Sequence, residues 1–569
     1  MDTKSDVVKL LSKAAGLKES EVSEILEIPP SPELGDYALP CFKLAAKLKS
    51  EPKKIAYELS KKIKLSEMIK EVKVVGPYVN VFLNQIAIAE NLICNVVAKG
   101  KNFGAASSKK GLALVEFVSP NTNKPLHLGH LRNAALGESI CRILESEGHN
   151  VVRACLYNDR GVHICKSMLA YKKWGGSKTP KSEKIKPDHF VGDYYVMFAK
   201  AAAENPKLEE EAQEMLRKWE AGDKNVVSLW KKLDGWALAG FARTFKDIGI
   251  SFDKYYAESK HYKAAKSTII AYYEKGLFKK DESGNIIADL SKENLPNKVV
   301  LRADGTSVYT TQDVALAKIK YDEFKPEISI YVVADEQNLH FQQLFAILKK
   351  LGIKAGQYYH MSYGLVNLPE GRMKSREGTV VDADDLVEEL RDSVKIEIES
   401  RHDHALGEKK TNELAHKIGL AALKYYLLKF HPKTTMTFDP KKSIALEGDT
   451  GPYLQYALVR ARKILQKAGK MPNKASFNLL QKPEEINLVK KISAFPEVVA
   501  KSGREYAPNL VANYAFELAN SFSSFYEACP VIAAESEQIK NMRLKLVQAF
   551  AQVLKNALYL LGIDEVDVM

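Results

Sequence analysis

The sequence predicts a multidomain protein, in which a nucleotide-binding α/β domain stands between a small N-terminal α/β domain and a C-terminal helical bundle. Three observations predict this arrangement. The chain has 569 residues, enough for three or more domains. A strand–helix–strand pattern lies between residues 112 and 156. Beyond Asp382, nearly every segment has the apolar spacing of a helix.

The N-terminal domain is expected to span residues 1–95. Two helical stretches and two strands are predicted there, at residues 7–15, 39–63, 72–75 and 79–83. Pro52 is expected to begin a new helix, because proline suits the first helical position. A Gly76-Pro77 turn separates the strands. Residues 99–110, rich in Gly, Ser and Lys, form the predicted linker.

The α/β domain is expected to span residues 110–380 and to begin with a βαβ unit. Leu112–Val118 is an apolar run typical of a buried strand, and Val151–Leu156 is predicted as the next strand. Between them a helix is predicted from about Leu128, with Pro125 at its first position and Gly148 at its end. The start of this helix therefore lies at the carboxyl edge of a parallel sheet, where such folds bind ligands.

His127, Gly129 and His130 lie at that helix start. Two imidazoles three residues apart flank a glycine that lets a ligand approach the backbone, and the free helix amides attract phosphate. The pattern therefore predicts a nucleotide site. The alternative is a helix start with one capping histidine.

The rest of the α/β domain is predicted from residue 166 onward. Residues 166–290 are largely helical and charged, which indicates an insertion. The expected elements after it are a hairpin, a helix, a βα unit, a strand and a loop, at residues 299–310, 311–321, 328–351, 358–365 and 367–378.

A helical connector, residues 381–440, and a helical bundle, residues 441–569, are expected to follow. Their predicted helices are residues 383–402, 409–430, 450–468, 484–503, 508–528 and 535–561.

Charge and cysteine content narrow the class of protein. Lys and Arg outnumber Asp and Glu by 84 to 71, a net charge of +13, which favours a polyanionic partner such as RNA. A merely lysine-rich protein is the alternative. The six cysteines are scattered, and the spacing of Cys155, His163 and Cys165 fits no common zinc pattern, so we expect no metal site. Without a signal peptide or a membrane-length apolar run, we expect a soluble, cytoplasmic protein with no membrane partner.

The segment His127-Leu-Gly-His130 resembles the histidine signature of class I aminoacyl-tRNA synthetases. With Glu116-Phe-x-Ser-Pro-Asn121 and Lys124 upstream, it is similar to the arginyl-tRNA synthetase version. Residues 34–38 and 76–80 resemble that family's N-terminal module, and residues 447–457 resemble the opening of its anticodon-binding bundle.

This resemblance implies a Rossmann-type class I catalytic domain and an arginine–tRNA ligase. Arginine and ATP would give arginyl-adenylate and pyrophosphate, and the terminal ribose hydroxyl of arginine tRNA would then attack the acyl carbon. The family's adenylate formation depends on bound tRNA. Mg²⁺ is expected to accompany ATP without a dedicated protein site, and no other cofactor is expected. We expect a monomer.

The second class I signature is expected in the loop that contains Arg372, Met373, Lys374 and Ser375. Ser375 stands where the second signature lysine is usual. Family members that lack this lysine carry one just before the histidine signature, and Lys124 fits that description. A one-residue shift would instead give the role to Lys374, and a solvated basic loop is the further alternative.

The resemblance also implies an arginine site. A guanidinium offers five donors in one plane and needs buried acceptors. Asp313 matches the position that meets the guanidinium, with Tyr309 beside it, and Asn121 and Gln337 match positions that hold the amino-acid backbone groups. Glu116 stands in an apolar strand, where a carboxylate needs a partner. That partner is either the ligand or an internal Lys or Arg.

Four residues are candidate tRNA contacts: Asn80, Phe82, Tyr453 and Arg460. Aromatic faces and basic side chains suit unpaired bases and phosphates, although a packed strand or helix explains the same residues. The family often ends in a basic approach to a terminal methionine. Here acids precede Met569, so contacts there are not expected.

Three rival functions remain open at this point. A nucleotidyltransferase would share the two histidines but needs no long helical bundle. A catalytically silent tRNA-binding protein would keep both flanking domains, but it would have no need of the two histidines, Lys124 and Asp313. Another class I synthetase, such as a lysyl or glutamyl one, is the nearest alternative.

Overall fold

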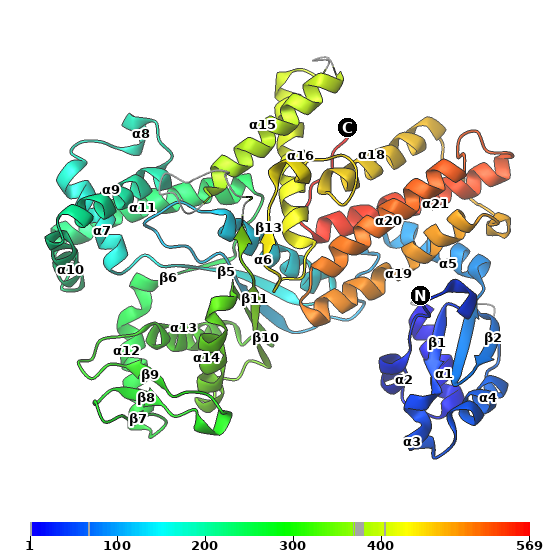
Figure 1. The fold of residues 1–569 in the computed structure, drawn as a ribbon, viewed down its shortest axis with the longest axis horizontal. Coiled ribbons are helices and arrows are strands. Elements are labelled where there is room, and N and C mark those ends of the chain that lie inside the picture. Colours follow the sequence, from blue (N-terminus) through cyan, green and yellow to red (C-terminus); the bar gives the residue numbers. More distant parts are fainter. Residues whose placement is uncertain (1–2, 66–68, 368, 370–380, 403–405) are drawn as a thin grey trace.

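The computed structural model describes residues 3–65, 69–367, 369, 381–402 and 406–569. Its three parts are distinct in Figure 1: a central sheet with an attached group of helices on the left, a helical bundle on the upper right, and a small N-terminal domain below the bundle. Among the described residues, no helix combines the length and apolar character needed to cross a membrane.

The central sheet has five parallel strands in the order β11-β10-β4-β5-β6. Their bounds are β4 Leu112–Glu116, β5 Asn150–Tyr157, β6 Lys254–Ala257, β10 Ile328–Ala334 and β11 Gln357–Tyr363. The predicted βαβ unit is confirmed, since α6 (Leu128–Ser146) connects β4 to β5. β4 lies in the middle of the sheet, which explains its unbroken apolar run.

The predicted beginning of the helical pattern at Leu128 is confirmed, since α6 begins there with His127 as its cap. Pro125 does not occupy the first helical position as expected, because the residues before His127 form an irregular turn.

The insertion is helical as predicted, but it ends earlier than expected. Its helices are α7 Val162–Trp174, α8 Pro180–Glu183, α9 Pro187–Glu204, α10 Lys207–Glu220 and α11 Lys224–Asp247. After α11 the chain returns to the central sheet as β6 and continues into α12 (Glu258–Glu274). The sequence analysis missed β6. Only Tyr256 of its four residues is fully buried, so the strand lacks an apolar run.

The predicted hairpin at residues 299–310 is also wrong. β9 (Lys298–Leu301) pairs antiparallel with β8 (Ile286–Ala288), which pairs with β7 (Lys279–Lys280). Residues 309 and 310 belong to the next helix instead of a strand, and Thr311 caps the first turn of that helix: its hydroxyl accepts from the Val308 amide and donates to the Val300 carbonyl. That helix, α13, spans Tyr309–Phe324, and α14 spans Asn338–Lys350.

The N-terminal domain packs helices on a small antiparallel sheet of order β1-β3-β2. Its elements are α1 Thr3–Ala15, α2 Glu19–Ile25, β1 Tyr37–Pro40, α3 Ala45–Leu48, α4 Pro52–Lys62, β2 Ile69–Val75 and β3 Tyr78–Leu83. Pro52 opens α4 as predicted, whereas β1 replaces the start of the helical stretch expected from residue 39. α5 (Gln85–Lys99) then leads to the central domain.

The six predicted C-terminal helices match the observed ones within a few residues. The observed helices are α15 Ala383–His402, α16 Glu408–Leu428, α18 Gly451–Ala468, α19 Pro483–Glu505, α20 Asn509–Ala528 and α21 Glu537–Leu560. The short helix α17 (Pro440–Ser443) was not predicted. A short parallel pair, β12 (Val366–Asn367) and β13 (Met436–Thr437), was not predicted. Short 3₁₀ turns lie at Pro32–Leu34, Cys41–Leu44, Gly100–Asn102, Ser291–Glu293, Asp335–Gln337 and Phe477–Leu479.

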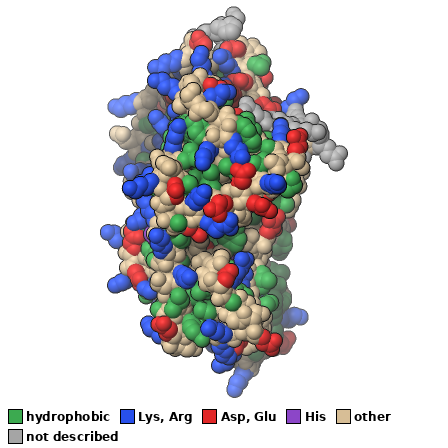
Figure 2. Space-filling view, turned by 90° about the vertical axis from the view of Figure 1, so that its left-hand side faces the viewer, with side chains coloured by type: hydrophobic (Ala, Val, Ile, Leu, Met, Phe, Trp, Pro, Cys, Tyr) green, Lys and Arg blue, Asp and Glu red, His purple; other side chains and the backbone are tan. Residues whose placement is uncertain are grey.

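Helix α6 joins the sheet to the bundle. It packs against α16, α19 and α21, and the Ser139 hydroxyl donates to the Leu560 carbonyl at 2.8 Å. One hydrophobic core runs from the N-terminal domain through the sheet into the bundle, while the insertion has a core of its own. On the face shown in Figure 2, Lys and Arg side chains are spread widely and interspersed with Asp and Glu. The excess of Lys and Arg over Asp and Glu is therefore not clustered in one patch on this face.

Candidate active site

The turn between β4 and α6 is held in a strained conformation. Val118 and Ser119 have φ values of +68° and +44°, a region that non-glycine residues and above all β-branched ones avoid. The Asn133 side chain holds the turn: its oxygen accepts from the Val118 amide at 2.7 Å, and its nitrogen donates to the Val332 carbonyl at 2.7 Å. Strain kept in place by buried hydrogen bonds is typical of a functional site.

His127 and His130 cap the first turn of α6. The Nδ1 of His127 accepts from the Gly129 amide at 3.1 Å, and the Nδ1 of His130 accepts from the His127 amide at 3.2 Å. Both histidines therefore act as caps, where the alternative reading of the sequence expected one. A Cβ on Gly129 would come within 2.9 Å of the His127 ring, so only glycine leaves room for this ring.

Capping also fixes the protonation of the two rings. Because each Nδ1 is an acceptor, the ring proton of each neutral imidazole lies on Nε2. Burial and the charge of Lys124 lower the pKa of His127 to about 4. Burial, His127 and Lys124 lower the pKa of His130 well below its usual range. Two neutral N–H donors result, and neither Nε2 has a hydrogen-bond partner within the part of the chain that the structure describes.

Lys124 lies beside the two histidines on the same turn. It is half-buried, and among the described residues it has no ion pair. Gly192 of α9 packs so closely on this turn that a Cβ there would meet the Pro125 ring at 2.7 Å. An unpaired ammonium next to two N–H donors is an arrangement suited to phosphate.

Residues 381–383 pair with the start of α6. The Leu128 amide donates to the Val381 carbonyl at 2.9 Å, and the Ala383 amide donates to the Leu126 carbonyl at 3.0 Å. His127 and Asp382 face each other in this antiparallel bridge. The candidate second-signature residues Arg372, Met373, Lys374 and Ser375 lie outside the described residues.

A pocket opens at the same edge of the sheet, between β5, α12 and α13. Its lining includes Asn158, Glu258, Tyr309, Gln312 and Asp313. Tyr309 is 84% exposed at the start of α13, and the carboxylate of Asp313 lies on the next turn. The pocket therefore presents two carboxylates and two amide side chains, which are acceptors suited to a guanidinium.

Asp313 already has one partner inside the protein. His340 Nε2 lies 2.8 Å from its Oδ2, and the Asp313 side chain remains 32% exposed. His340 therefore orients this carboxylate.

Glu116 is held by an internal partner. The Lys320 ammonium donates to Glu116 Oε2, and both side chains are buried. Lys320 also lies over the rings of Tyr256 and Tyr331. The partner of Glu116 in this structure is therefore an internal lysine. Glu116 is not among the residues that line the pocket.

Asn121 and Gln337 are both exposed at the carboxyl edge and do not line the pocket. Asn121 forms an isolated bridge with Asn158, and Gln337 ends the 3₁₀ turn that follows β10. Glu258 and Gln312 were not recognised from the sequence. Glu258 directly follows β6, so recognition of that strand would have placed this carboxylate at the ligand-binding edge.

The N-terminal candidates differ in accessibility. Asn80 is only 3% exposed, and its side-chain oxygen is buried without a partner among the described residues. Phe82 is half-buried, with the Lys73 ammonium 4.9 Å from its ring centroid. Phe82 and Lys73 are therefore more accessible to a ligand than Asn80 is.

The two candidates in α18 have partners within the bundle. The Tyr453 hydroxyl donates to Asn520 Oδ1 at 2.9 Å, and the Arg460 guanidinium lies between the rings of Tyr456 and Tyr526. Near the C-terminus, Glu565 binds Arg462 and Lys555. The acids that precede Met569 thus pair with basic residues of the bundle.

Family models match nearly the whole chain in three consecutive segments. Residues 1–83 match the arginyl-tRNA synthetase N-terminal domain. Residues 92–439 match the catalytic domain of class I (R) tRNA synthetases, and residues 454–569 match the DALR anticodon binding domain.

Curated relatives and solved structures agree with this result. The chain is 46% identical to the arginine–tRNA ligase of Treponema denticola over 96% of this chain and 94% of the relative. It is 40% identical to the Borrelia hermsii arginine–tRNA ligase, over 99% and 97% of the two chains. The arginyl-tRNA synthetase structure from Thermus thermophilus superposes with a TM-score of 0.86 at 28% identity, covering 99% of each chain.

These matches cover both flanking domains as well as the sheet, which excludes a nucleotidyltransferase. The matching domains and relatives are those of arginine enzymes, which excludes another class I synthetase. The chain belongs to the class I arginyl-tRNA synthetases and is an arginine–tRNA ligase.

Proposed function

We propose that Lys124, His127, Gly129 and His130 hold the phosphates of ATP while arginine is activated. The observation that carries this proposal is the pair of capped, neutral imidazoles. Each has its only N–H on Nε2, and no described residue accepts from either Nε2. Gly129 keeps the helix start open to the nucleotide.

In this reaction the arginine carboxylate attacks the α-phosphorus and pyrophosphate leaves. Negative charge shifts toward the departing phosphates, so donors and cations that already point there stabilise the transition state. Because His127 and His130 are neutral, they donate hydrogen bonds without giving up a proton. Lys124 supplies the positive charge on the same turn.

We assign the arginine side chain to the pocket beside α13. Asp313, oriented by His340, accepts from the guanidinium, and Tyr309 covers it. Asn121 and Gln337 at the edge of the sheet hold the amino and carboxylate groups. Glu116 contributes through its buried pair with Lys320, which ties β4 to α13, the helix that carries Asp313.

Mg²⁺ enters with ATP as part of the substrate, bound through phosphate oxygens. We assign Arg372, Met373, Lys374 and Ser375 to the same phosphates on the basis of their sequence alone. The resulting adenylate is then attacked by the terminal ribose hydroxyl of the tRNA, and AMP leaves.

We divide the work among the domains as follows. Residues 110–380 catalyse, residues 381–440 connect, and the flanking domains, residues 1–95 and 441–569, bind arginine tRNA. Phe82 and Lys73 form the tRNA-binding surface that we propose for the N-terminal domain. The buried Asn80 supports β3, the strand that carries Phe82. Tyr453 and Arg460 are the surface proposed for the bundle. We take the enzyme to act as a monomer in the cytoplasm.

His127→Asn and His130→Asn test the phosphate site. Asparagine places an acceptor near the position of Nδ1 and is itself a favoured cap, but it has no group at Nε2. We expect ATP–pyrophosphate exchange, measured with tRNA present, to fall about a hundredfold while the thermal midpoint stays unchanged. Unchanged exchange in both variants would remove the histidines from the reaction.

Asp313→Asn tests the arginine pocket. The change keeps the shape of the side chain and removes the charge that meets the guanidinium, so arginine affinity should fall by at least about thirtyfold. ATP affinity, measured in the same preparation, serves as the control and should not change. Wild-type arginine affinity would show that Asp313 is structural and that the pocket lies elsewhere.

A further inference from the structure

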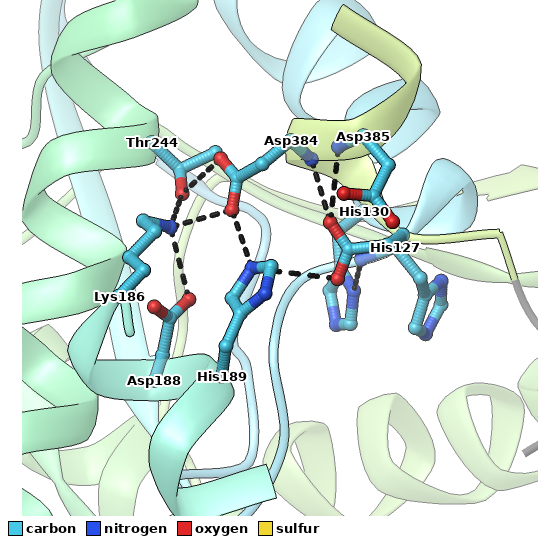
Figure 3. A network of polar contacts seen from close by, with 9 residues as sticks. His127, His130, Lys186, Asp188, His189, Thr244, Asp384 and Asp385 are labelled. Carbon is cyan, nitrogen blue, oxygen red and sulfur yellow. Dashed lines mark hydrogen bonds and ion pairs between the residues drawn. The ribbon is translucent and has the colours of Figure 1, made fainter. Parts of the chain in front are cut away.

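A partly buried charge cluster joins the insertion to the start of α15, and the established reaction gives it no role. Figure 3 shows Lys186, Asp188 and His189 at the start of α9, Thr244 from α11, and Asp384 from α15 converging on one another. His127 and His130 lie next to this cluster in the same view.

The carboxylate of Asp384 is the centre of the cluster. Its Oδ2 accepts from His189 Nε2 at 2.8 Å and from the Lys186 ammonium at 2.6 Å, while its Oδ1 accepts from the Thr244 hydroxyl at 3.0 Å. Burial opposes ionisation here, but the hydrogen bonds from His189 and Lys186 outweigh it and lower the pKa of Asp384 to about 2. Asp384 is therefore a permanent anion with three donors.

Asp382 links this cluster to the β4–α6 turn. Its Oδ1 accepts from the Asp384 and Asp385 amides at 2.9 and 3.2 Å, which starts α15, and its Oδ2 lies 3.5 Å from His189 Nε2. Its backbone faces His127, between the two hydrogen bonds that join residues 381–383 to residues 126–128. The position of Asp384 therefore fixes the backbone on both sides of His127.

Asp188, His189 and Asp384 have atoms close enough together to be considered as metal ligands. The Lys186 ammonium, however, bonds both Asp188, at 3.1 Å, and Asp384, at 2.6 Å. A cation therefore already lies between the two carboxylates, in the place that a metal ion would take.

We propose that Asp384 and His189 are positioning residues for ATP: by anchoring residues 381–383 to the insertion, they hold the start of α6 and its histidines in the geometry that binds the phosphates. This proposal rests on the phosphate role given above to His127 and His130. Neither Asp384 nor His189 touches the substrate. A loss of the anchor leaves the histidines intact but displaces the backbone that carries them, and small displacements of binding groups lower reaction rates strongly.

The test compares Asp384→Asn, His189→Leu and His189→Gln in ATP–pyrophosphate exchange with tRNA present. Asp384→Asn and His189→Leu remove the charge and the donor, and each should raise the KM for ATP about tenfold or more. His189→Gln restores a donor near the position of Nε2, so its KM for ATP should lie within about threefold of the wild-type value. The KM for arginine should change less than about twofold in all three, because the arginine pocket is built on α12 and α13.

Asp385→Asn is the matched control. Asp385 lies on the same turn of α15 but is exposed, and Figure 3 shows its side chain directed away from Lys186. This variant should keep the wild-type KM for ATP. The proposal is overturned if Asp384→Asn keeps the wild-type KM for ATP, or if the KM values for ATP and arginine rise together while the thermal midpoint falls. It is also overturned if His189→Gln behaves like His189→Leu.

The His127→Asn variant distinguishes a failure of the positioning role from a failure of the phosphate site. If His127→Asn impairs exchange and Asp384→Asn does not, only the positioning role fails. If His127→Asn has no effect, the phosphate site itself is misplaced.

Discussion

The helical bundle and the carboxyl edge of the parallel sheet differ in how their charged side chains are paired. In the bundle, Arg543 donates to Glu485, to the Pro530 carbonyl and to Glu535, at 2.8, 2.8 and 2.9 Å. Glu485 in turn accepts from the Gln481 and Lys482 amides. This pair is buried and fully satisfied without any ligand.

At the sheet edge, charged groups lack an opposite charge. The Asp234 carboxyl is buried beside Asp159, and Lys124 has no ion pair among the described residues. Unpaired charged groups cost free energy that a ligand recovers on binding. The Arg543–Glu485 pair therefore serves stability, whereas the charged groups at the sheet edge serve substrate binding. Substitutions in the two regions should therefore have opposite consequences.

The largest effect is expected for Arg543→Met. Removal of one partner leaves the Glu485 carboxylate buried and unpaired, which should cost about 3–5 kcal/mol of unfolding free energy. Denaturant unfolding followed by circular dichroism measures this loss. The double variant Arg543→Met with Glu485→Met should recover most of it, since no charge remains buried. A single variant as stable as the wild type would show that the bundle does not depend on this pair.

Lys124→Ala should have the next largest effect, on catalysis alone. Its charge matters chiefly as pyrophosphate departs, so turnover in exchange should fall about a hundredfold, or about 2.7 kcal/mol, with arginine affinity unchanged. Lys172→Ala, which removes an exposed lysine of α7, is the control and should behave as wild type. Unchanged turnover in Lys124→Ala would assign the charge to Lys374 or to no lysine.

Asp234→Asn should stabilise the protein, and the gain should depend on pH. Burial and the charge of Asp159 raise the pKa of Asp234 to about 7. In the unfolded chain this carboxyl ionises near pH 4, so its burial costs nothing below pH 4, costs increasingly more from pH 4 to 7, and costs most above pH 7.

We expect the Asp234→Asn variant to gain about 2 kcal/mol at pH 8, roughly half of what the full shift would give, because the new amide leaves one buried group unmatched. Thermal unfolding at pH 4 and pH 8 measures the difference. Asp247→Asn, at an exposed position later in α11, should show no such gain. A gain that is equal at both pH values would mean that the pKa of Asp234 is not raised in the folded protein.

The smallest effect is expected for Arg460→Ala. Its guanidinium lies 4.6 and 4.8 Å from the Tyr456 and Tyr526 rings, so the variant should lose about 1 kcal/mol of stability. Because Arg460 is already engaged, tRNA affinity in a filter-binding assay should fall less than about tenfold. Arg460→Lys keeps the charge and should retain the affinity. A loss of a hundredfold or more would place the guanidinium in direct contact with RNA.

The sequence allowed the bundle to be predicted more closely than the sheet domain. Helical periodicity placed α15 at its observed bounds and α18 within one residue of them, because long amphipathic helices carry their signal locally. β6 was not predicted because it forms by pairing with β5, a strand about 100 residues earlier in the chain. The start of α13 was mispredicted because it depends on the capping role of Thr311.

The same distinction applies to the site: residues close together in the sequence could be predicted, and contacts between distant residues could not. The histidines and Lys124 lie on one short turn and could be found from spacing. The sequence also indicated that Glu116 needs a buried partner. It could not identify Lys320, more than 200 residues away, as that partner. The bridge between residues 126–128 and 381–383 is likewise invisible to any local pattern.

The contacts of α6 with the end of the bundle have a consequence for the synthesis of this enzyme. Ser139 and Arg142 donate to the carbonyls of Leu560 and Tyr559, and Lys424 donates to that of Gly562. A chain still on the ribosome contains both histidines long before it contains residues 559–562. The helix that presents the histidines therefore stays uncovered on one side until these residues have been synthesised. We expect chains that stop before them to consume neither ATP nor arginine.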